Sequence, residues 1–156
     1  MKLILALFFL LFLPVSCTTI PGDDPVDPPI DEPIDEPKED LKELLSLINN
    51  QRERVGLSPL SQTTKLTCAA KKHSEDMGTY KFCSHTGRYG SSPWDRAREC
   101  GTEAHGEIIA CGQSTPTQAV IAWMNSPAHR KLMLHPDFKS VGLGMHKNYW
   151  TAIFSR

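Results

Sequence analysis

The chain has 156 residues, 40% hydrophobic and 22% charged, which fits one globular domain of modest size plus extensions rather than several domains. Its formal net charge of -1 hides a division, because residues 18–40 carry nine acidic side chains and one lysine, whereas residues 41–156 carry 15 Lys and Arg against 9 Asp and Glu. The basic surplus favours anionic surface polymers or lipid headgroups as partners, or is an ordinary solvated surface, and no pattern indicates a nucleic-acid, phosphate-loop or dinucleotide site.

The N-terminal segment, residues 1–16, predicts a signal peptide for export. A lysine at the second position precedes an apolar run at residues 3–13, which has the length of a signal core and is short for a membrane-spanning helix. Cys17 ends the sequence Leu-Pro-Val-Ser-Cys, which resembles a bacterial lipoprotein signal, so we expect Cys17 to carry a lipid. Pro14 departs from that signal, and secretion without a lipid is the alternative.

Residues 17–40 are predicted to form the lipidated cysteine and a linker rich in Asp, Glu and Pro. A segment of this composition cannot bury a hydrophobic core, and its prolines and like charges favour an extended chain. The linker either holds the domain away from a membrane surface or is a spacer with no special role.

Four cysteines remain when the N-terminal one is acylated, and an even number in an exported protein favours two disulfides. Three connectivities are possible for Cys68, Cys83, Cys100 and Cys111. We favour Cys83 with Cys100, because this bridge would tie down the segment between them. The second bridge, Cys68 with Cys111, would then tie a helix to the sheet. The alternative role for Cys83 is a catalytic thiol, because it lies two residues before His85 and both side chains point to one side of an extended chain.

Helical spacing of apolar residues predicts the first elements of a domain at residues 41–156. A first helix opens the domain and ends before Gly56, and a second helix runs from about Thr63 to Gly78. His73 lies on the apolar face of the second helix. It is interpreted as a core histidine with one hydrogen bond, and a ligand role is the alternative.

Two more helices are predicted from their start signals. Residues 115–118, Thr-Pro-Thr-Gln, have the residue types of a capping box and open a helix that runs through Trp123. Ser126 and Pro127 have the residue types of an N-cap and a first helical position, which places His129 in the first turn of a short helix. The helix dipole there disfavours the imidazolium form and leaves a neutral ring nitrogen available.

Three runs predict strands, at Ile108–Cys111, Val141–Met145 and Trp150–Phe154. The last two would form an antiparallel hairpin with a polar turn at residues 147–148. Two glycines in the Val141–Met145 run suggest close approach of another backbone or of a ligand. Residues 86–101 show no period and predict a loop, which either roofs a site or is an ordinary surface connection.

Four separated motifs resemble the CAP superfamily, the cysteine-rich secretory, antigen 5 and pathogenesis-related 1 proteins, in its short bacterial form. The motifs are Ser84-His85, Gly106-Glu107, residues 123–129 and residues 141–144. They occur in the family's order over about residues 41–154. The resemblance implies an α+β fold, namely an α/β/α sandwich with a small antiparallel sheet and a C-terminal hairpin.

The resemblance also implies a central cleft, where members place two histidines and two acidic residues that in some of them bind a divalent metal. His85, Glu107 and His129 match the first histidine, the first glutamate and the second histidine. Ser126 stands in place of the second glutamate, and Ile108 in place of an asparagine. The predicted binding cleft is His85, Glu107, Ser126 and His129. Two histidines and one carboxylate equal the protein ligands of a three-ligand zinc site, and the alternative is a His–Glu hydrogen-bonded network without metal.

Two classes of function follow from this site. We favour a non-enzymatic surface module, anchored by its lipid to a membrane of the bacterial cell envelope, whose cleft accepts a lipid, a cell-wall fragment or a protein. The alternative is a metal-assisted hydrolase of peptidase type, in which Glu107 acts as the base and a metal on His85 and His129 activates water. The first class is favoured because the motifs contain no complete set of nucleophile, base and orienting residue. No nucleic-acid partner is expected.

Overall fold

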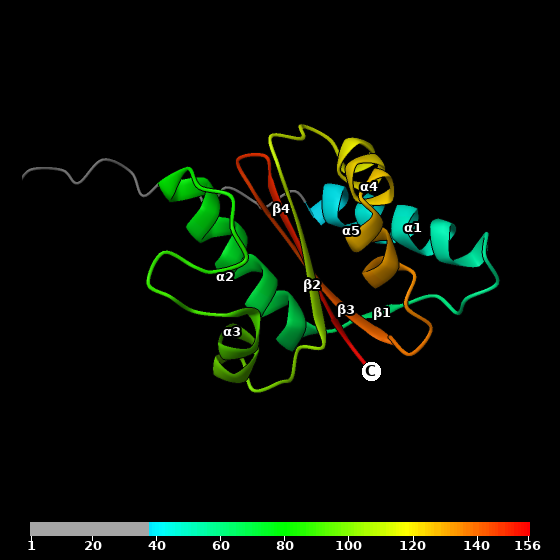
Figure 1. The fold of residues 1–156 in the computed structure, drawn as a ribbon, viewed down its shortest axis with the longest axis horizontal. Helices are drawn as coiled ribbons and strands as arrows, with labels where there is room; N and C mark the ends of the chain where they lie inside the picture. Colours follow the sequence, from blue (N-terminus) through cyan, green and yellow to red (C-terminus); the bar gives the residue numbers. More distant parts are fainter. Residues whose placement is uncertain (1–37) are drawn as a thin grey trace, which may run out of the picture. The chain divides into compact units, whose positions relative to one another are not determined.

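The computed structural model describes residues 38–156, which form an α/β/α sandwich. The helices are α1 (Lys38–Glu53), α2 (Thr64–Tyr80), α3 (Pro93–Glu99), α4 (Pro116–Asn125) and α5 (Pro127–Met133). Figure 1 shows α2 and α3 on one face of the sheet and α1, α4 and α5 on the other. The fold class expected from the sequence is confirmed, and the first two helices have bounds close to those predicted.

The sheet contains four strands in the order β1-β3-β4-β2. The strands are β1 (Ser61–Gln62), β2 (Gly106–Cys111), β3 (Ser140–His146) and β4 (Tyr149–Ser155). Strands β2, β4 and β3 pair antiparallel, and β3 and β4 form the predicted hairpin, with positive φ at Lys147 and Asn148 as a tight hairpin turn requires. The two residues of β1 pair parallel to β3, so the sheet is mixed. A strand of two residues is too short to show alternating polar and apolar residues, so the sequence did not predict β1.

The N-cap hydrogen bonds predicted for α4 and α5 form only in part. The Thr115 hydroxyl accepts the Gln118 amide hydrogen at 3.2 Å, as predicted. The Gln118 side chain accepts from the Ser114 amide at 3.0 Å, however, rather than from that of Thr115, so the predicted capping box is incomplete. Ser126 occupies the N-cap position of α5, but its side chain makes no capping bond. Both helices nevertheless begin with the predicted proline.

The predicted loop over residues 86–101 is wrong, because α3 forms within it. The Ser92 hydroxyl accepts the Asp95 amide at 3.2 Å, and the Asp95 carboxylate accepts the Ser92 amide at 2.9 Å, which is a complete capping box. Pro93 fills the first helical position. A helix of 7 residues is too short to reveal an apolar period. Its start signal, Ser-Pro-Trp-Asp, was present in the sequence.

The disulfides join Cys68 to Cys100 and Cys83 to Cys111, so two bridges form but the predicted pairing is wrong. Cys100 caps the C-terminal end of α3, and α3 packs on α2, which carries Cys68. The pairing therefore depends on a helix that the sequence did not reveal. Cys83 bonds instead to the last residue of β2. The catalytic-thiol alternative for Cys83 fails, because its sulfur is in a disulfide.

Helix α2 packs so closely on β3 that two strand positions require glycine. A Cβ atom at Gly142 would overlap the backbone of Leu66, and one at Gly144 would lie 2.5 Å from the carbonyl carbon of Ala70. The two glycines therefore allow the close approach of another backbone, one of the two alternatives predicted from the sequence. The contact holds the buried side of α2 against the sheet.

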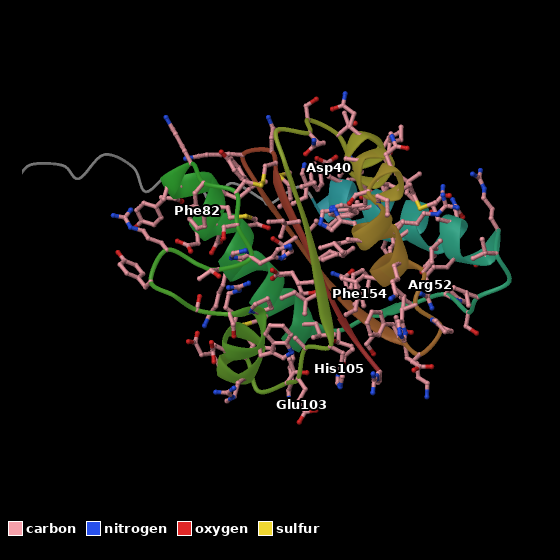
Figure 2. All side chains as sticks on the ribbon, in the orientation of Figure 1. Asp40, Arg52, Phe82, Glu103, His105 and Phe154 are labelled. Carbon is pink, nitrogen blue, oxygen red and sulfur yellow. A yellow bond between two sulfur atoms is a disulfide. The ribbon has the colours of Figure 1, made fainter. Side chains whose placement is uncertain are left out.

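Arg52, near the end of α1, is completely buried and fixes the segment that follows α5 (Figure 2). Its guanidinium group donates to the carbonyl oxygens of Met133 at 2.9 Å, His135 at 3.0 Å and Phe138 at 3.1 Å. Its Nε donates to the carbonyl oxygen of Ser58 at 2.9 Å. Burial lowers the pKa of Arg52. Within residues 38–156 no carboxylate pairs with this cation, so backbone dipoles alone stabilise it.

The expected signal peptide at residues 1–16, the lipid on Cys17 and most of the linker at residues 17–40 lie outside the described residues and stay predictions. Helix α1 already begins at Lys38, ahead of the expected domain start. Among the helices of residues 38–156, none is both long enough and apolar enough to cross a membrane.

Candidate functional site

The first two predicted site residues form a direct contact between separate elements. His85 lies in the segment after α2, and Glu107 is the second residue of β2. The His85 Nδ1 atom donates to Glu107 Oε1 at 2.8 Å. The Glu107 side chain is 2% exposed, whereas that of His85 is 50% exposed. Because Nδ1 carries the proton, the neutral ring of His85 keeps a lone pair on Nε2.

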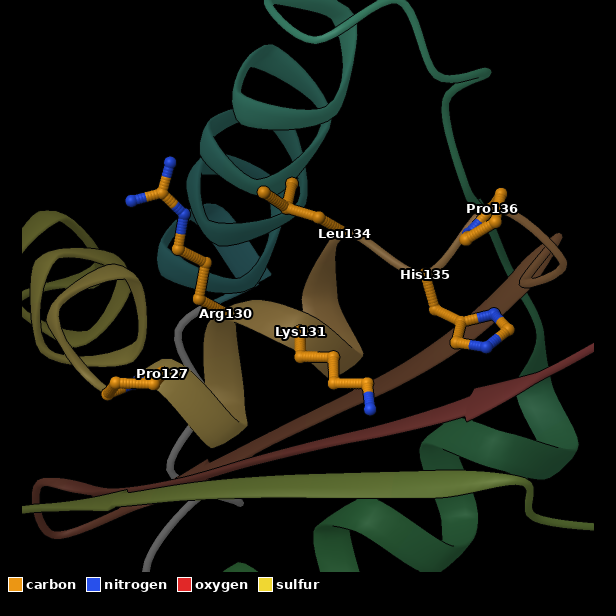
Figure 3. A pocket seen from close by; sticks show the side chains of 6 residues that line it. All are labelled: Pro127, Arg130, Lys131, Leu134, His135 and Pro136. Carbon is orange, nitrogen blue, oxygen red and sulfur yellow. The ribbon is translucent and has the colours of Figure 1, made fainter.

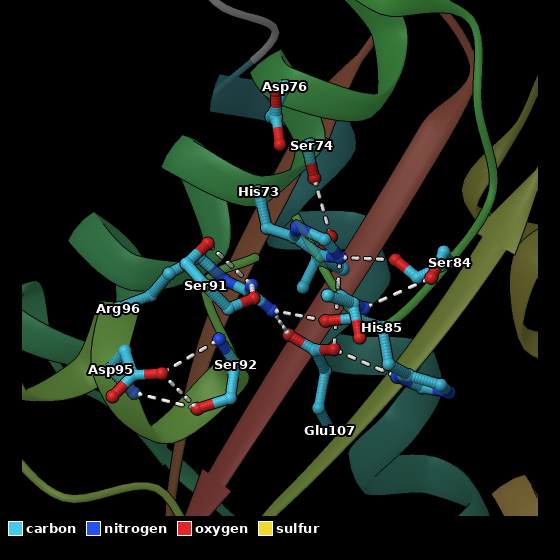
Figure 4. A network of polar contacts seen from close by, with 12 residues as sticks. His73, Ser74, Asp76, Ser84, His85, Ser91, Ser92, Asp95, Arg96 and Glu107 are labelled. Carbon is cyan, nitrogen blue, oxygen red and sulfur yellow. Dashed lines mark hydrogen bonds and ion pairs between the residues drawn. The ribbon is translucent and has the colours of Figure 1, made fainter. Parts of the chain in front are cut away.

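Arg96 completes this contact, and sequence reasoning missed it. It projects from α3, and its Nη2 donates to Glu107 Oε2 at 2.7 Å and to the carbonyl oxygen of His85 at 3.1 Å. Its Nη1 donates to the carbonyl oxygen of Ser91 at 2.8 Å. The Arg96 side chain is 4% exposed, and Figure 4 shows it reaching from α3 to the strand. One guanidinium group thus fixes the carboxylate of Glu107 and the backbone that carries His85.

His73 lies behind the same carboxylate and is a core histidine, in agreement with the sequence interpretation. Its Nε2 donates to the carbonyl oxygen of Ser84 at 2.8 Å and lies 3.9 Å from Glu107 Oε1. Burial is the largest cause that lowers the pKa of His73, and the nearby Arg96 adds to it. The neutral form of the ring is therefore favoured, and its bond to Ser84 positions the chain next to His85 (Figure 4).

His129 lies in the first turn of α5, where the sequence placed it. Its ring centroid is 6.2 Å from that of His85. Burial and then the charge of His85 lower the pKa of His129, so its neutral form is favoured. Ser126 precedes α5 and is half-buried. Neither His129 nor Ser126 lines the cavity that adjoins Glu107.

That cavity has a volume of about 410 Å³ and lies between β2, α3 and α5. It is lined by His85, Thr86, Ser92, Pro93, Trp94, His105, Gly106, Glu107 and Leu132. Trp94 is 55% exposed. It lies in the first turn of α3, the helix that begins with a complete capping box. The cavity presents an exposed aromatic ring, two further apolar side chains and several polar groups. We call it the Trp94 cleft.

The predicted zinc ligands do not fit a three-ligand metal site. Both oxygens of Glu107 are already bonded, Oε1 to His85 and Oε2 to Arg96. A metal on this carboxylate would have to compete with His85 at Oε1 or with the buried Arg96 cation at Oε2. Within residues 38–156, no three His, Cys, Asp or Glu side chains are placed to hold one metal ion. The arrangement is a hydrogen-bonded network, which was the alternative reading of the motif.

The site contains two of the three groups of a nucleophilic triad. Glu107 orients His85 as a carboxylate orients the base of a catalytic triad. Among residues 38–156, however, no hydroxyl or thiol group hydrogen-bonds to the His85 ring. The site therefore holds a base and its orienting group without a nucleophile.

Comparison with known sequences finds one family over most of the described chain. The model of the cysteine-rich secretory protein family, CAP, matches residues 45–154. The uncharacterized Bacillus subtilis protein YkwD is 37% identical over 116 residues, which cover 72% of this chain and 45% of that protein. The uncharacterized B. subtilis membrane protein YlbC is 34% identical over 114 residues, covering 72% and 33%. The chain thus spans less than half the length of these two relatives.

Comparison with solved structures finds the same sandwich in two bacterial proteins. An extracellular protein of Bacillus anthracis that contains an SCP domain matches with a TM-score of 0.70 and 29% identity, over 74% of this chain and 39% of that one. An outer surface protein of Borrelia burgdorferi matches with a TM-score of 0.67 and 27% identity, over 76% of this chain and 94% of that one.

Proposed function

The chain belongs to the cysteine-rich secretory protein (CAP) family, and from that membership we propose that it is an exported, non-enzymatic surface module that binds a saccharide-containing cell-wall fragment in the Trp94 cleft. The contacts of Glu107 carry this proposal. Both of its oxygens are bonded, one to Arg96 and one to His85, so this carboxylate shapes the wall of the cleft. A general base must reach the proton that it abstracts, whereas the Glu107 side chain is 2% exposed and each of its oxygens already accepts a hydrogen bond.

The lining of the Trp94 cleft supports a sugar as the bound group. The exposed indole ring of Trp94 offers a flat apolar surface for the C–H face of a sugar ring. Ser92 and the two histidines of the lining place polar groups around it. A volume of about 410 Å³ lies in the ordinary range of small-ligand pockets. A purely apolar ligand such as an acyl chain would offer no partner to the second ring nitrogen of either histidine, since only Nδ1 of each is bonded within residues 38–156.

Export and anchoring belong to the same proposal. The signal peptide expected at residues 1–16 would direct export, and the lipid expected on Cys17 would hold the domain at the bacterial cell envelope, with secretion as the alternative. The two solved relatives, described as an extracellular and an outer surface protein, are consistent with export. Intact-mass measurement of the protein from membranes tests the anchor, and an unmodified Cys17 would exclude it.

The binding role is tested by titrating the full chain with a purified disaccharide-peptide muropeptide in a calorimeter. We expect Trp94→Ala to weaken binding by at least about tenfold, as expected for a central aromatic anchor. Ile121→Ala is the matched control, because Ile121 is 54% exposed on α4 and Trp94 is 55% exposed on α3. Absence of binding by the wild type, or equal losses in both variants, would refute the proposal.

The same samples address the alternative function, a peptidase-like metal-assisted hydrolase. Mass spectrometry of the muropeptide after incubation with the protein and zinc should find it intact. Cleavage that disappears in Glu107→Gln would establish the hydrolase and exclude the non-enzymatic role. The bonded state of Glu107 is the reason that we expect no cleavage.

A further inference from the structure

A second pocket lies at α5, and none of its residues lines the Trp94 cleft. Its volume is about 550 Å³. It is lined by Pro127, Arg130, Lys131, Leu134, His135 and Pro136 (Figure 3). We propose that this pocket, here called the α5 pocket, binds the phosphate groups of a soluble phosphodiester polymer of the cell surface, such as a glycerol phosphate chain.

The polar side chains that line the α5 pocket are all hydrogen-bond donors, and no carboxylate side chain lies among them. Arg130 and Lys131 are exposed, and neither side chain has a hydrogen-bond or ion-pair partner among residues 38–156. No aspartate or glutamate belongs to the lining. Unpaired cations around a hollow attract an anion, and charge-assisted hydrogen bonds to phosphate are among the stronger polar contacts.

His135 is held in the state that donates into this pocket. Its Nδ1 accepts the backbone N–H of Asp137 at 3.2 Å, so the neutral ring carries its hydrogen on Nε2. The ring stacks on Phe138 with centroids 4.7 Å apart, which fixes its orientation. His135 therefore supplies a donor whether or not it is protonated. Figure 3 shows the side chains of Lys131 and His135 pointing to the same side.

A buried cation adds to the positive potential of the α5 pocket. Arg52 donates to the carbonyl oxygens of Met133 and His135, and so lies directly behind the segment that forms the pocket wall. Its charge has no carboxylate partner within residues 38–156, and in a medium of low dielectric constant such a charge acts over a longer range than a surface charge. The same hydrogen bonds keep the wall in one conformation.

The placement of the donors favours a polymer of phosphates over one isolated anion. Lys131 and His135 face one side, whereas Figure 3 shows Arg130 pointing away from them. One phosphate can therefore contact the first two, while Arg130 reaches the next phosphate of the same chain. A membrane surface is less suitable. The exposed large hydrophobic residues of the described chain, Val55, Tyr80, Tyr89, Trp94 and Ile121, all lie outside the α5 pocket, so it lacks an anchor for the lipid interface.

The proposal is tested by calorimetry on the full chain with two probes, inorganic phosphate and a short glycerol phosphate oligomer. We expect Lys131→Gln to weaken the binding of both probes by about tenfold, the effect of one charge-assisted hydrogen bond. Arg130→Gln should weaken only the oligomer, because one phosphate does not reach both positions. Lys65→Gln is the control, since Lys65 is an exposed lysine on α2, in the other helix layer.

Four results would overturn the proposal. The first is no binding of the oligomer by the wild type, and the second is an equal loss in Lys131→Gln and Lys65→Gln, which would indicate general charge attraction. The third is equal affinity for a polyglutamate of the same length, which would show that carboxylates suffice. The fourth is tighter binding to vesicles of phosphatidylglycerol and phosphatidylcholine than to the oligomer, which would favour a membrane instead. Circular dichroism of each variant confirms that it is folded. Trp94→Ala should leave oligomer binding unchanged, so this site is separable from the Trp94 cleft.

Discussion

The guanidinium group of Arg96 lies 2.7 Å from the carboxylate of Glu107, and the side chains of both residues are almost completely buried. Removing one member of a buried ion pair leaves the other charge without compensation. We therefore expect Arg96→Ala to lower the free energy of unfolding by about 3 to 5 kcal/mol in urea titrations. The bond also holds His85, so the same variant should lose muropeptide binding.

An exposed ion pair between α2 and α3 is the control for this prediction. Lys72 and Glu99 lie 3.1 Å apart with side chains 48% and 59% exposed. Lys72→Ala should cost less than about 1 kcal/mol, because water screens such a pair. Similar costs for the two variants would show that Glu107 is solvated in solution.

The second prediction concerns acid. Burial lowers the pKa of His73 and of His129, so both rings bind a proton less readily in the folded chain than in the unfolded one. The unfolded state therefore gains protons first as the pH falls below about 6.5, and each histidine destabilises the fold by up to about 1.4 kcal/mol per pH unit there. Urea midpoints between pH 8 and pH 5 should reveal this loss. His73→Gln should reduce the slope, and an unchanged slope would contradict the argument.

The third prediction separates the two disulfides. Each closes a loop, with sequence separations of 32 and 28, so each removal should cost about 3 to 4 kcal/mol. Only the bridge from Cys83 to Cys111 anchors the segment that carries His85. Replacing this pair by alanine should therefore release the His85 side of the Trp94 cleft, whereas replacing Cys68 and Cys100 should loosen the end of α3, the helix that carries Trp94. Peptide mapping without reduction checks the pairing itself.

The fourth prediction concerns zinc. A metal on Glu107 would compete with His85 or with Arg96, and no three possible ligands of residues 38–156 surround one point, so micromolar zinc should not raise the melting temperature, and EDTA should not lower it. Thermal scans at neutral pH measure both. A rise in melting temperature that is lost in His129→Ala would show that the two histidines bind metal without the carboxylate.

The sequence predicts those parts of the fold in which a pattern repeats. Apolar spacing marked α1 and α2, alternation marked the final hairpin, and separate motifs marked His85, Glu107 and His129. Arg96 could not be found in this way, because α3 is too short to show a period and arginine is common on surfaces. The disulfide pairing failed for the same reason, since it depends on the position of α3.

The capping signal at the start of α3, if used, would have predicted this helix from the sequence. Ser92 and Asp95 have the spacing that starts a helix, and that helix would have placed Arg96 on its buried face, toward Glu107. In segments without a hydrophobic period, the start signal of a helix is the only local information about its position. The α5 pocket had no local signal beyond its charges, because Arg52 lies far from it in the sequence.

The contact of α2 with Gly142 and Gly144 has a consequence for genetics. Because the neighbouring atoms are backbone atoms of Leu66 and Ala70, no side-chain substitution on α2 can make room for a Cβ on β3. A Gly142→Ala allele should therefore have no second-site suppressor in α2. A selection for restored folding should return true revertants to glycine or changes that stabilise the domain elsewhere, and never a compensating partner across the contact.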